Sequence, residues 1–115
     1  ELAVGNRVLS EQTSQTLLLM LEQVVERSAV RAQINGYRVG GKTGTAQIAA
    51  ANYSRDAHNA IFVGIVPIPN PRIVVAVIVN EPQGREYYGG QVAAPIFASI
   101  ASRTLRLLGV APDKI

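Results

Sequence analysis

The most regular hydrophobic pattern in the first quarter of the chain has the spacing of an α-helix. Its apolar positions recur every three or four residues, at Leu17, Leu18, Leu21, Val24 and Val25. Ser10 can cap the first turn, and Glu11 places a negative charge at the positive end of the helix dipole. We therefore expect a helix over residues 10–27. Leu19 and Met20 widen the apolar stripe, so we expect this helix to be mostly buried in the core rather than to present a partner-binding face.

Three later segments have the character of β-strands. Apolar and polar side chains alternate at the start of residues 37–48, and residues 60–66 form a short apolar run. Within the strand expected at residues 72–80, residues 73–79 are apolar on both faces and largely β-branched, so we expect this strand to lie centrally in a sheet covered on both sides. The proline-rich connection at residues 67–71 is long enough for a hairpin and too short for a parallel crossover. The sheet is therefore predicted to be antiparallel.

A second helical pattern closes the chain. Its predicted apolar face carries Ala93, Ile96, Phe97, Ile100, Thr104, Leu107 and Leu108. We expect this helix over residues 91–108, with Pro95 in the first turn, where its missing N–H is tolerated. Gly109 and Pro112 are expected to end the helix. The order of helix, three strands and helix predicts an α+β fold, in which helices flank an antiparallel sheet.

Composition narrows the possible functions. The 115 residues are 48% hydrophobic and 17% charged, which is typical of one globular domain. A net charge of +3 without a run of Lys or Arg gives no reason to expect nucleic acid as a partner. The chain has no cysteine, and His58 is its only histidine, so we expect no metal and no cofactor. We expect His58, Arg55 and Asp56 to lie in a solvated loop. The sequence does not begin with Met, and we expect it to be part of a longer protein.

Residues 36–43 match the pattern of a phosphate-binding loop, G-x-x-x-x-G-K-[ST]. In such a loop, backbone N–H groups surround phosphates, Lys42 would bind their outer oxygens and Thr43 would bind Mg²⁺. The loop must follow a buried strand and open a helix. Residues 28–35 make a poor central strand, and Gly44 and Thr45 make a poor first helical turn. A nucleotide-binding function therefore remains only a weak alternative.

The same residues make better sense as a strand. Alternation places Lys42 and Gly44 on one face and Thr43 and Thr45 on the other. Gly44 has no side chain, so a ligand backbone can lie against it. Thr45 can offer its hydroxyl to a carboxylate and its backbone N–H to a developing oxyanion. Lys42 can attract an anion and keep a neighbouring serine or lysine in its reactive protonation state.

Lys-Thr-Gly-Thr resembles the third motif of the penicillin-recognising serine acyl-transferases. The longer string at residues 36–47, together with Glu81-Pro82, resembles class B penicillin-binding proteins. Tyr87-Tyr88-Gly89-Gly90 and the Ala-Ala-Pro-Ile-Phe run at residues 93–97 are similar to the cell-division type, the septal peptidoglycan transpeptidase. The tail at residues 108–113 is similar as well. The resemblance covers essentially the whole chain.

This resemblance implies the C-terminal portion of a transpeptidase fold of the penicillin-binding protein and serine β-lactamase type. The family's nucleophile lies in an S-x-x-K motif and its second motif is S-x-N. None of the six serines of this chain begins either motif. We therefore expect the nucleophile, the general base and two further strands, normally paired beside strand 72–80, to come from an N-terminal part of the same domain. A related carboxypeptidase or β-lactam sensor is the alternative.

The resemblance also implies roles for individual residues and for partners. Lys42 and Thr45 would be catalytic, and Thr43, Gly44, Thr45, Gln47 and Tyr88 would bind the substrate or a β-lactam. Gly89 and Gly90 would serve loop geometry. The partners would be peptidoglycan stem peptides ending in D-Ala-D-Ala, β-lactams and divisome membrane proteins. The protein would act on the periplasmic face of the bacterial inner membrane, held by an anchor outside these residues.

Overall fold

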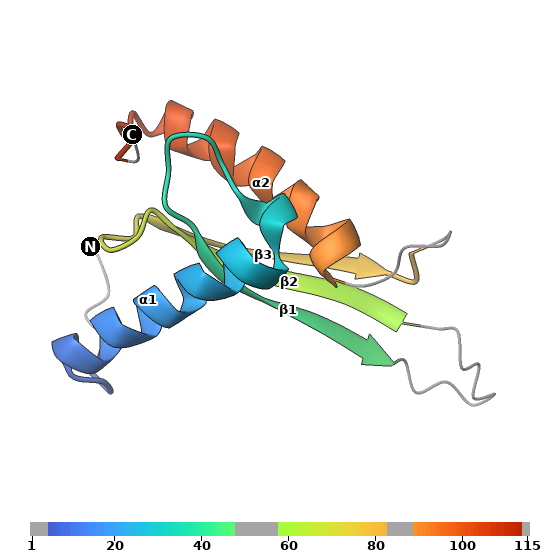
Figure 1. The fold of residues 1–115 in the computed structure, drawn as a ribbon, viewed down its shortest axis with the longest axis horizontal. Helices are drawn as coiled ribbons and strands as arrows, with labels where there is room; N and C mark the ends of the chain where they lie inside the picture. Colours follow the sequence, from blue (N-terminus) through green and yellow to red (C-terminus); the bar gives the residue numbers. More distant parts are fainter. Residues whose placement is uncertain (1–4, 48–57, 83–88, 114–115) are drawn as a thin grey trace.

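A computed structural model describes residues 5–47, 58–82 and 89–113 of the chain. It contains two long helices, one short 3-10 helix and three strands (Figure 1): α1 (Glu11–Ser28), η1 (Val30–Ala32), β1 (Gly40–Gln47), β2 (His58–Val66), β3 (Ile73–Asn80) and α2 (Gly89–Leu107). The predicted α+β class and antiparallel sheet are confirmed. Arg55, Asp56, Tyr87 and Tyr88 lie outside the described residues.

The sheet has the order β1-β2-β3, so β2 is its central strand. Strand 72–80 was expected to end the three strands of this chain and to become central only beside two further strands from an N-terminal part, and its edge position agrees with the first half of that expectation. The central position with both faces covered stays a prediction. β3 lies at an edge, and Val74 and Ile78 on one of its faces are each 65% exposed. A run of β-branched residues signals a strand but does not say which neighbours it has.

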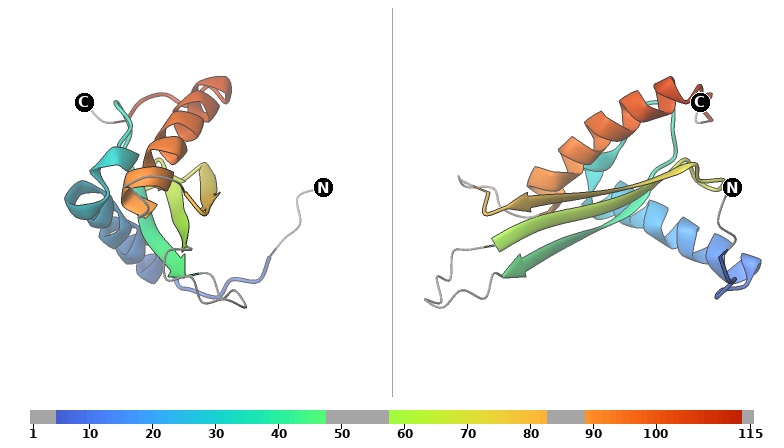
Figure 2. Two further views of the ribbon diagram at one scale, coloured as in Figure 1. Left: turned by 90° about the vertical axis from the view of Figure 1, so that its right-hand side faces the viewer. Right: turned by 180° about the vertical axis from the view of Figure 1, so that it is seen from behind.

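Helix α1 begins as its sequence predicts, because the Ser10 side chain accepts a hydrogen bond from the N–H of Thr13. Its expected burial was wrong, since only Leu18 and Val25 are buried. The wide apolar stripe of α1 is larger than its contact with the strand beside it, so Met20 remains 58% exposed. Figure 2 shows α1 beside β1 and α2 along one face of the sheet.

The strand that carries the Lys-Thr-Gly motif begins later than predicted. Residues 37–39 do not belong to β1, because Tyr37 closes a turn in which its N–H donates to the C=O of Ile34 at 3.2 Å. Gly36 supplies the left-handed backbone of this turn, with φ at 87°. Arg38 then forms two bonds with the Glu22 carboxylate, at 2.7 and 2.8 Å, and this hydrogen bonding raises the pKa of Arg38. The turn and the ion pair fix where β1 starts.

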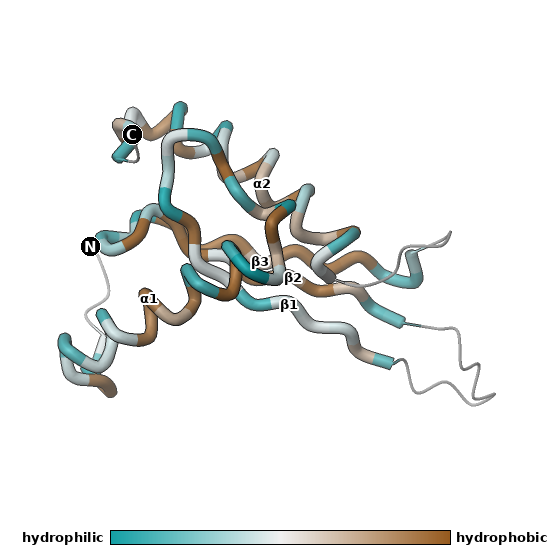
Figure 3. Tube along the Cα trace, viewed as in Figure 1, coloured by the Kyte–Doolittle hydropathy of each residue, from teal (hydrophilic) through white to brown (hydrophobic). Residues whose placement is uncertain are grey.

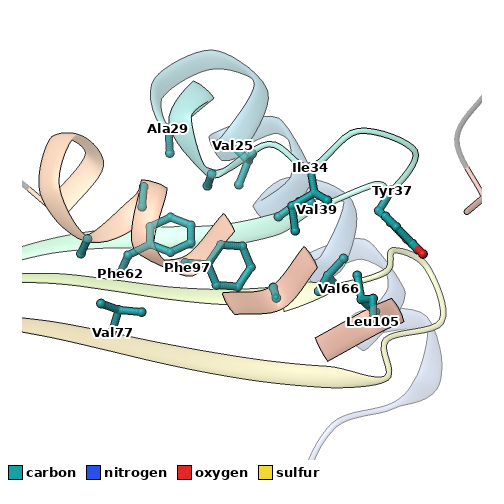
Figure 4. Packing of buried hydrophobic residues seen from close by; sticks show 14 residues of the cluster. Val25, Ala29, Ile34, Tyr37, Val39, Phe62, Val66, Val77, Phe97 and Leu105 are labelled. Carbon is teal, nitrogen blue, oxygen red and sulfur yellow. The ribbon is translucent and has the colours of Figure 1, made fainter. Parts of the chain in front are cut away.

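The core lies between α2 and the sheet, and its centre is an aromatic pair (Figure 4). The rings of Phe62 on β2 and Phe97 on α2 are both fully buried, with centroids 5.0 Å apart. A Cβ atom added at Gly64 would lie 2.3 Å from the Phe97 ring, so only glycine allows this ring to lie against β2. The aromatic pair and the glycine thus set the distance between helix and sheet.

Two expectations for the last helix were wrong. Its buried face consists of three alanines, Ala93, Ala94 and Ala101, and two large side chains, Phe97 and Leu105. Ile96, Ile100 and Leu107 are exposed instead, because alanines let the helix approach the sheet more closely than isoleucines would. Pro95 does not fall in the first turn, since α2 already begins at Gly89. Gly109 ends the helix with φ at 70°, as predicted.

The face of the sheet away from α2 is apolar and largely open in the described residues. Val63, Val74 and Ile78 are 41%, 65% and 65% exposed on this face. Figure 3 shows hydrophobic residues running along β2 and β3. Helix α2 packs along one face, whereas on the other face α1 lies only over the start of β1, next to Gly40. Apolar content alone therefore does not distinguish the two faces.

The segment after α2 returns to the turn that precedes β1. The N–H of Asp113 donates to the C=O of Gly36 at 2.9 Å, and the Tyr37 hydroxyl donates to the C=O of Val110. Pro112 lies against Gly36, where an added Cβ would be 3.0 Å from the proline ring. Residues 110–113 therefore hold the 34–37 turn in place.

A candidate active-site strand and its cavity

The register of β1 on β2 confirms the predicted alternation of the motif. Thr43 is paired with Phe62, which lies in the core beneath α2. Paired residues share a face, so Thr43 and Thr45 lie on the α2 side of the sheet. Lys42 and Gly44 lie on the opposite, open side.

The direction of the backbone groups follows from one hydrogen bond at the end of β2. In an antiparallel sheet, each residue of a central strand directs its N–H and C=O to one neighbour, and successive residues alternate between neighbours. The C=O of His58 accepts from the N–H of Glu81 on the β3 side, at 3.0 Å. Ile61 and Val63 therefore direct their backbone groups to β1. His58 itself is the first residue of β2, so its expected place in a loop was wrong.

The same alternation fixes the outer edge of β1. Gly44 and Lys42 are the partners of Ile61 and Val63, so they direct their backbone groups inward to β2. The backbone N–H and C=O of Thr43 and of Thr45 consequently point to the outer edge, where the described sheet has no further strand. A ligand at the outer edge of β1 could therefore meet both the hydroxyls and the backbone groups of Thr43 and Thr45.

A cavity of about 490 Å³ opens at this edge. It is lined by residues from the end of α1, from η1, from β1 and from the start of α2: Arg27, Ser28, Val30, Arg31, Thr43, Thr45, Gly90 and Gln91. Among the described residues, the lining contains two arginines and two threonine hydroxyls but no acidic side chain. These side chains suit an anionic ligand, because they supply positive charge and hydrogen-bond donors.

Lys42 reaches the same edge from the other face. Its side chain is exposed, and its Nζ donates a hydrogen bond to the C=O of Thr43 at 3.0 Å. Because that carbonyl points to the outer edge of β1, the ammonium group lies at this edge too. Lys42 is not among the residues that line the cavity. It therefore lies at the same edge of β1 as Thr43 and Thr45 but outside the cavity that these two threonines line.

The glycines of β1 serve different purposes. A Cβ at Gly41 would lie 2.4 Å from the Phe62 ring, so packing alone requires glycine there. A Cβ at Gly44 would meet only the Ile61 Cβ, at an ordinary 3.6 Å. The packing of the described residues therefore leaves the glycine at position 44 unexplained. The prediction that a ligand lies against Gly44 stays a prediction.

The remaining predicted site residues are less well placed or lie elsewhere. Gln47 is exposed at the last position of β1 and does not line the cavity. Tyr88 lies outside the described residues. Gly90 was expected in a loop, and this was wrong: it is the second residue of α2 and faces the cavity, where an added Cβ would lie 3.5 Å from the Thr43 Cγ2.

Sequence reasoning missed the two cavity arginines and Gln91. Arg31 donates a hydrogen bond from its Nη1 to the C=O of Gln91 at 3.0 Å, which joins η1 to α2. A signal was present, because Pro95 in a helix leaves the carbonyl four residues earlier without its usual N–H donor. The sequence gives no indication that Arg31 would be the replacement donor, since 60 residues separate it from Gln91.

The phosphate-loop alternative does not agree with this geometry. Gly40 to Gln47 form an edge strand of an antiparallel sheet, and no helix begins at Thr43. A phosphate loop needs the N-terminus of a helix at that point. In residues 5–47, 58–82 and 89–113, no group of three or more His, Asp or Glu side chains could hold a metal ion. Nor does any helix there have the length and apolar character required to cross a membrane.

Comparison with known sequences gives the family. The sequence model of the penicillin-binding protein transpeptidase domain matches residues 2–102. The chain belongs to this family. It is 44% identical to stage V sporulation protein D of Bacillus subtilis over 110 residues, which are 94% of this chain and 17% of that protein. It is 36% identical to the peptidoglycan D,D-transpeptidase FtsI of Escherichia coli over 114 residues, 96% of this chain and 19% of that protein.

The same relationship appears among solved structures. The TP domain of penicillin-binding protein 3 from Burkholderia pseudomallei superposes with a TM-score of 0.86 and 46% sequence identity, over 96% of this chain and 34% of that one. The fold is therefore that of a penicillin-binding protein transpeptidase domain. The chain spans less than a third of the length of the curated relatives it matches.

Proposed function

We propose that this chain is part of a peptidoglycan D,D-transpeptidase of the class B, cell-division type. Two of its relatives carry names linked to peptidoglycan D,D-transpeptidase activity and to sporulation. The chain would supply the Lys-Thr-Gly-Thr wall of the active site. The catalytic serine would come from an S-x-x-K motif, and the 115 residues contain no such motif.

The proposed reaction transfers an acyl group through the enzyme. The serine oxygen attacks the carbonyl carbon of the penultimate D-Ala of a stem peptide, and the bond to the terminal D-Ala breaks. The released D-Ala amine takes up a proton as it leaves. An amine of a neighbouring stem peptide then attacks the acyl-enzyme, forms the cross-link and frees the serine. A β-lactam would acylate the same serine.

The observation that supports this most directly is the arrangement of Thr43 and Thr45. Both threonines line the cavity, and their backbone groups point to the same edge of β1. A peptide laid along that edge would place its terminal carboxylate beside the hydroxyls. The N–H of Thr45 would stabilise the oxyanion formed at the attacked carbonyl.

Lys42 and the remaining predicted residues would act around this pair. The ammonium group of Lys42, beside the Thr43 carbonyl, would attract the substrate carboxylate and favour the reactive protonation state of the serine site. Gly44 would let the ligand backbone approach β1, and Gln47 and Tyr88 would contact the ligand further out. The open sheet face and the outer edge of β3 would pack against the N-terminal part of the same domain. Divisome membrane proteins at the periplasmic face of the inner membrane would be further partners.

Fluorescent penicillin tests this proposal. A longer chain that includes the S-x-x-K motif should be labelled covalently, whereas the 115-residue chain should not. Labelling of the 115-residue chain would contradict the proposed source of the nucleophile. Nucleotide binding at micromolar concentration would contradict the function as a whole. Incubation of the longer chain with a D-Ala-D-Ala peptide and an amine acceptor should yield the cross-linked product; hydrolysis alone would indicate a carboxypeptidase.

A further inference from the structure

Helix α2 contains a proline where a regular helix would need a backbone donor. Pro95 is the seventh residue of α2, so it lies inside the helix rather than in its first turn. In a regular α-helix, the N–H of residue 95 would donate to the C=O of Gln91. Proline has no N–H, and its ring pushes the carbonyl four residues earlier away from the helix axis. The Gln91 carbonyl therefore needs another donor.

Arg31 supplies this donor from a different part of the chain. Its Nη1 lies 3.0 Å from the Gln91 oxygen, a good hydrogen-bond distance for a charged group. The guanidinium thus joins η1 to the first turns of α2. The carbonyl that Arg31 binds is one that would accept from the N–H of residue 95 if that residue were not proline.

This bond lies at the wall of the cavity. Arg31 and Gln91 both line it, as does Gly90, the residue just before Gln91. A Cβ at Gly90 would be 3.5 Å from the Thr43 side chain and 3.6 Å from the Ser28 carbonyl, so the start of α2 lies in near contact with the other walls. A shift of the first turn of α2 would therefore change the space in front of Thr43 and Thr45.

We propose that Arg31 is a positioning residue: it replaces the backbone donor that Pro95 lacks and so fixes the start of α2 against the threonine pair. The inference about the bond follows from the fold alone, and its effect on catalysis rests on the proposed transpeptidase function. Arg31 acts through Gln91 and does not need to touch the substrate.

The test is a cycle of three variants in the complete transpeptidase domain: Arg31→Met, Pro95→Ala and the double variant. Pro95→Ala restores an N–H to the Gln91 carbonyl, and position 95 is exposed, so alanine fits there. Arg31→Met should slow acylation by fluorescent penicillin about tenfold and make the amide protons of residues 93–98 exchange about tenfold faster. The double variant should recover both rates to within about twofold of the unmodified domain.

Arg27→Met is the matched control, because it removes the same charge from the cavity but no bond to α2. Amide exchange in α2 should then be unchanged, and adding Pro95→Ala should not alter its acylation rate. An Arg31→Met variant with unchanged exchange in α2, or one that Pro95→Ala fails to restore, would overturn the inference. If the unmodified domain is not acylated at all, the proposed function fails, and the exchange measurements still decide whether Arg31 braces α2.

Discussion

The two faces of the sheet are similar in composition and opposite in their packing. Towards α2, Phe62 and Val77 are buried against the helix, and Phe97 fills the space above Gly64. On the other face, Val63 and Ile78 are as apolar and yet exposed. The difference shows that apolar composition alone does not decide which face the described residues bury. A glycine that admits an aromatic ring, and alanines that admit a close helix, define the packed face.

The same division runs through the site strand. Thr43 and Thr45 lie on the packed side, where the start of α2 and the end of α1 enclose them in a cavity. Lys42 and Gly44 lie on the open side. The Lys42 side chain lies at the outer edge of β1, where its Nζ donates a hydrogen bond to the Thr43 carbonyl. The packed side therefore presents the two threonines to the cavity, while the open side carries the exposed Lys42.

The largest effect should come from removing the ring that defines the packed face. Phe97→Ala should lower the free energy of unfolding by about 3–5 kcal/mol, because it leaves a cavity beside Phe62 and Gly64. Urea denaturation would measure this change. Ile100→Ala on the exposed side of α2 is the control and should cost less than about 1 kcal/mol. Equal losses in the two variants would contradict the comparison.

A smaller effect, measured as a rate, should separate the two sides of β1. Thr45→Val keeps the shape of the side chain and removes its hydroxyl, so it should slow acylation of the complete domain by about 10–100-fold. Stability should change by less than about 1 kcal/mol, since Thr45 is exposed. Ala46→Val on the other side of β1 should leave the rate unchanged. A rate for Thr45→Val within twofold of the unmodified domain would remove Thr45 from the site.

The smallest effect is expected on the open face. Ile78→Thr in the 115-residue chain should change the free energy of unfolding by less than about 0.5 kcal/mol, because the side chain is 65% exposed. Urea denaturation beside Phe97→Ala gives the direct comparison. A loss above about 1 kcal/mol would mean that this face is covered in solution. The same substitution in the complete domain should cost more if a further part of the protein packs there.

The sequence predicted the parts of this fold that depend on local physics. Ser10 marks the start of α1, because its side chain accepts a hydrogen bond from the helix backbone. The proline-rich connection after Val66 is too short for a parallel crossover, so the two strands that it joins must be antiparallel. The alternation of side chains along a strand predicted that Thr43 and Thr45 share a face, and this prediction did not depend on which residues form the core. These features require only a few neighbouring residues.

What the sequence did not reveal depends on contacts between distant segments. The buried face of α2 was misjudged because large aliphatic residues suggest a core, whereas Ala94 and Ala101 make the close contact. The cavity required the end of α1 and the start of α2 to meet beside β1. The Arg31 bond to Gln91 spans 60 residues and replaces a local bond that Pro95 prevents. No local pattern encodes such a pairing.

The strap formed by residues 110–113 bears on the order in which this protein folds. The turn ahead of β1 and the next residue donate to the Val110 carbonyl and the Asp113 carboxylate, and the Gly36 carbonyl accepts from the Asp113 N–H. Val110 and Asp113 are made some 70 residues later during synthesis. While the ribosome is still producing α2, the motif strand can pair with β2 but lacks support at its beginning. Contacts this distant in sequence form late, because closing the long loop between them costs entropy first. The site strand should therefore become rigid only after α2 and residues 110–113 have been synthesised.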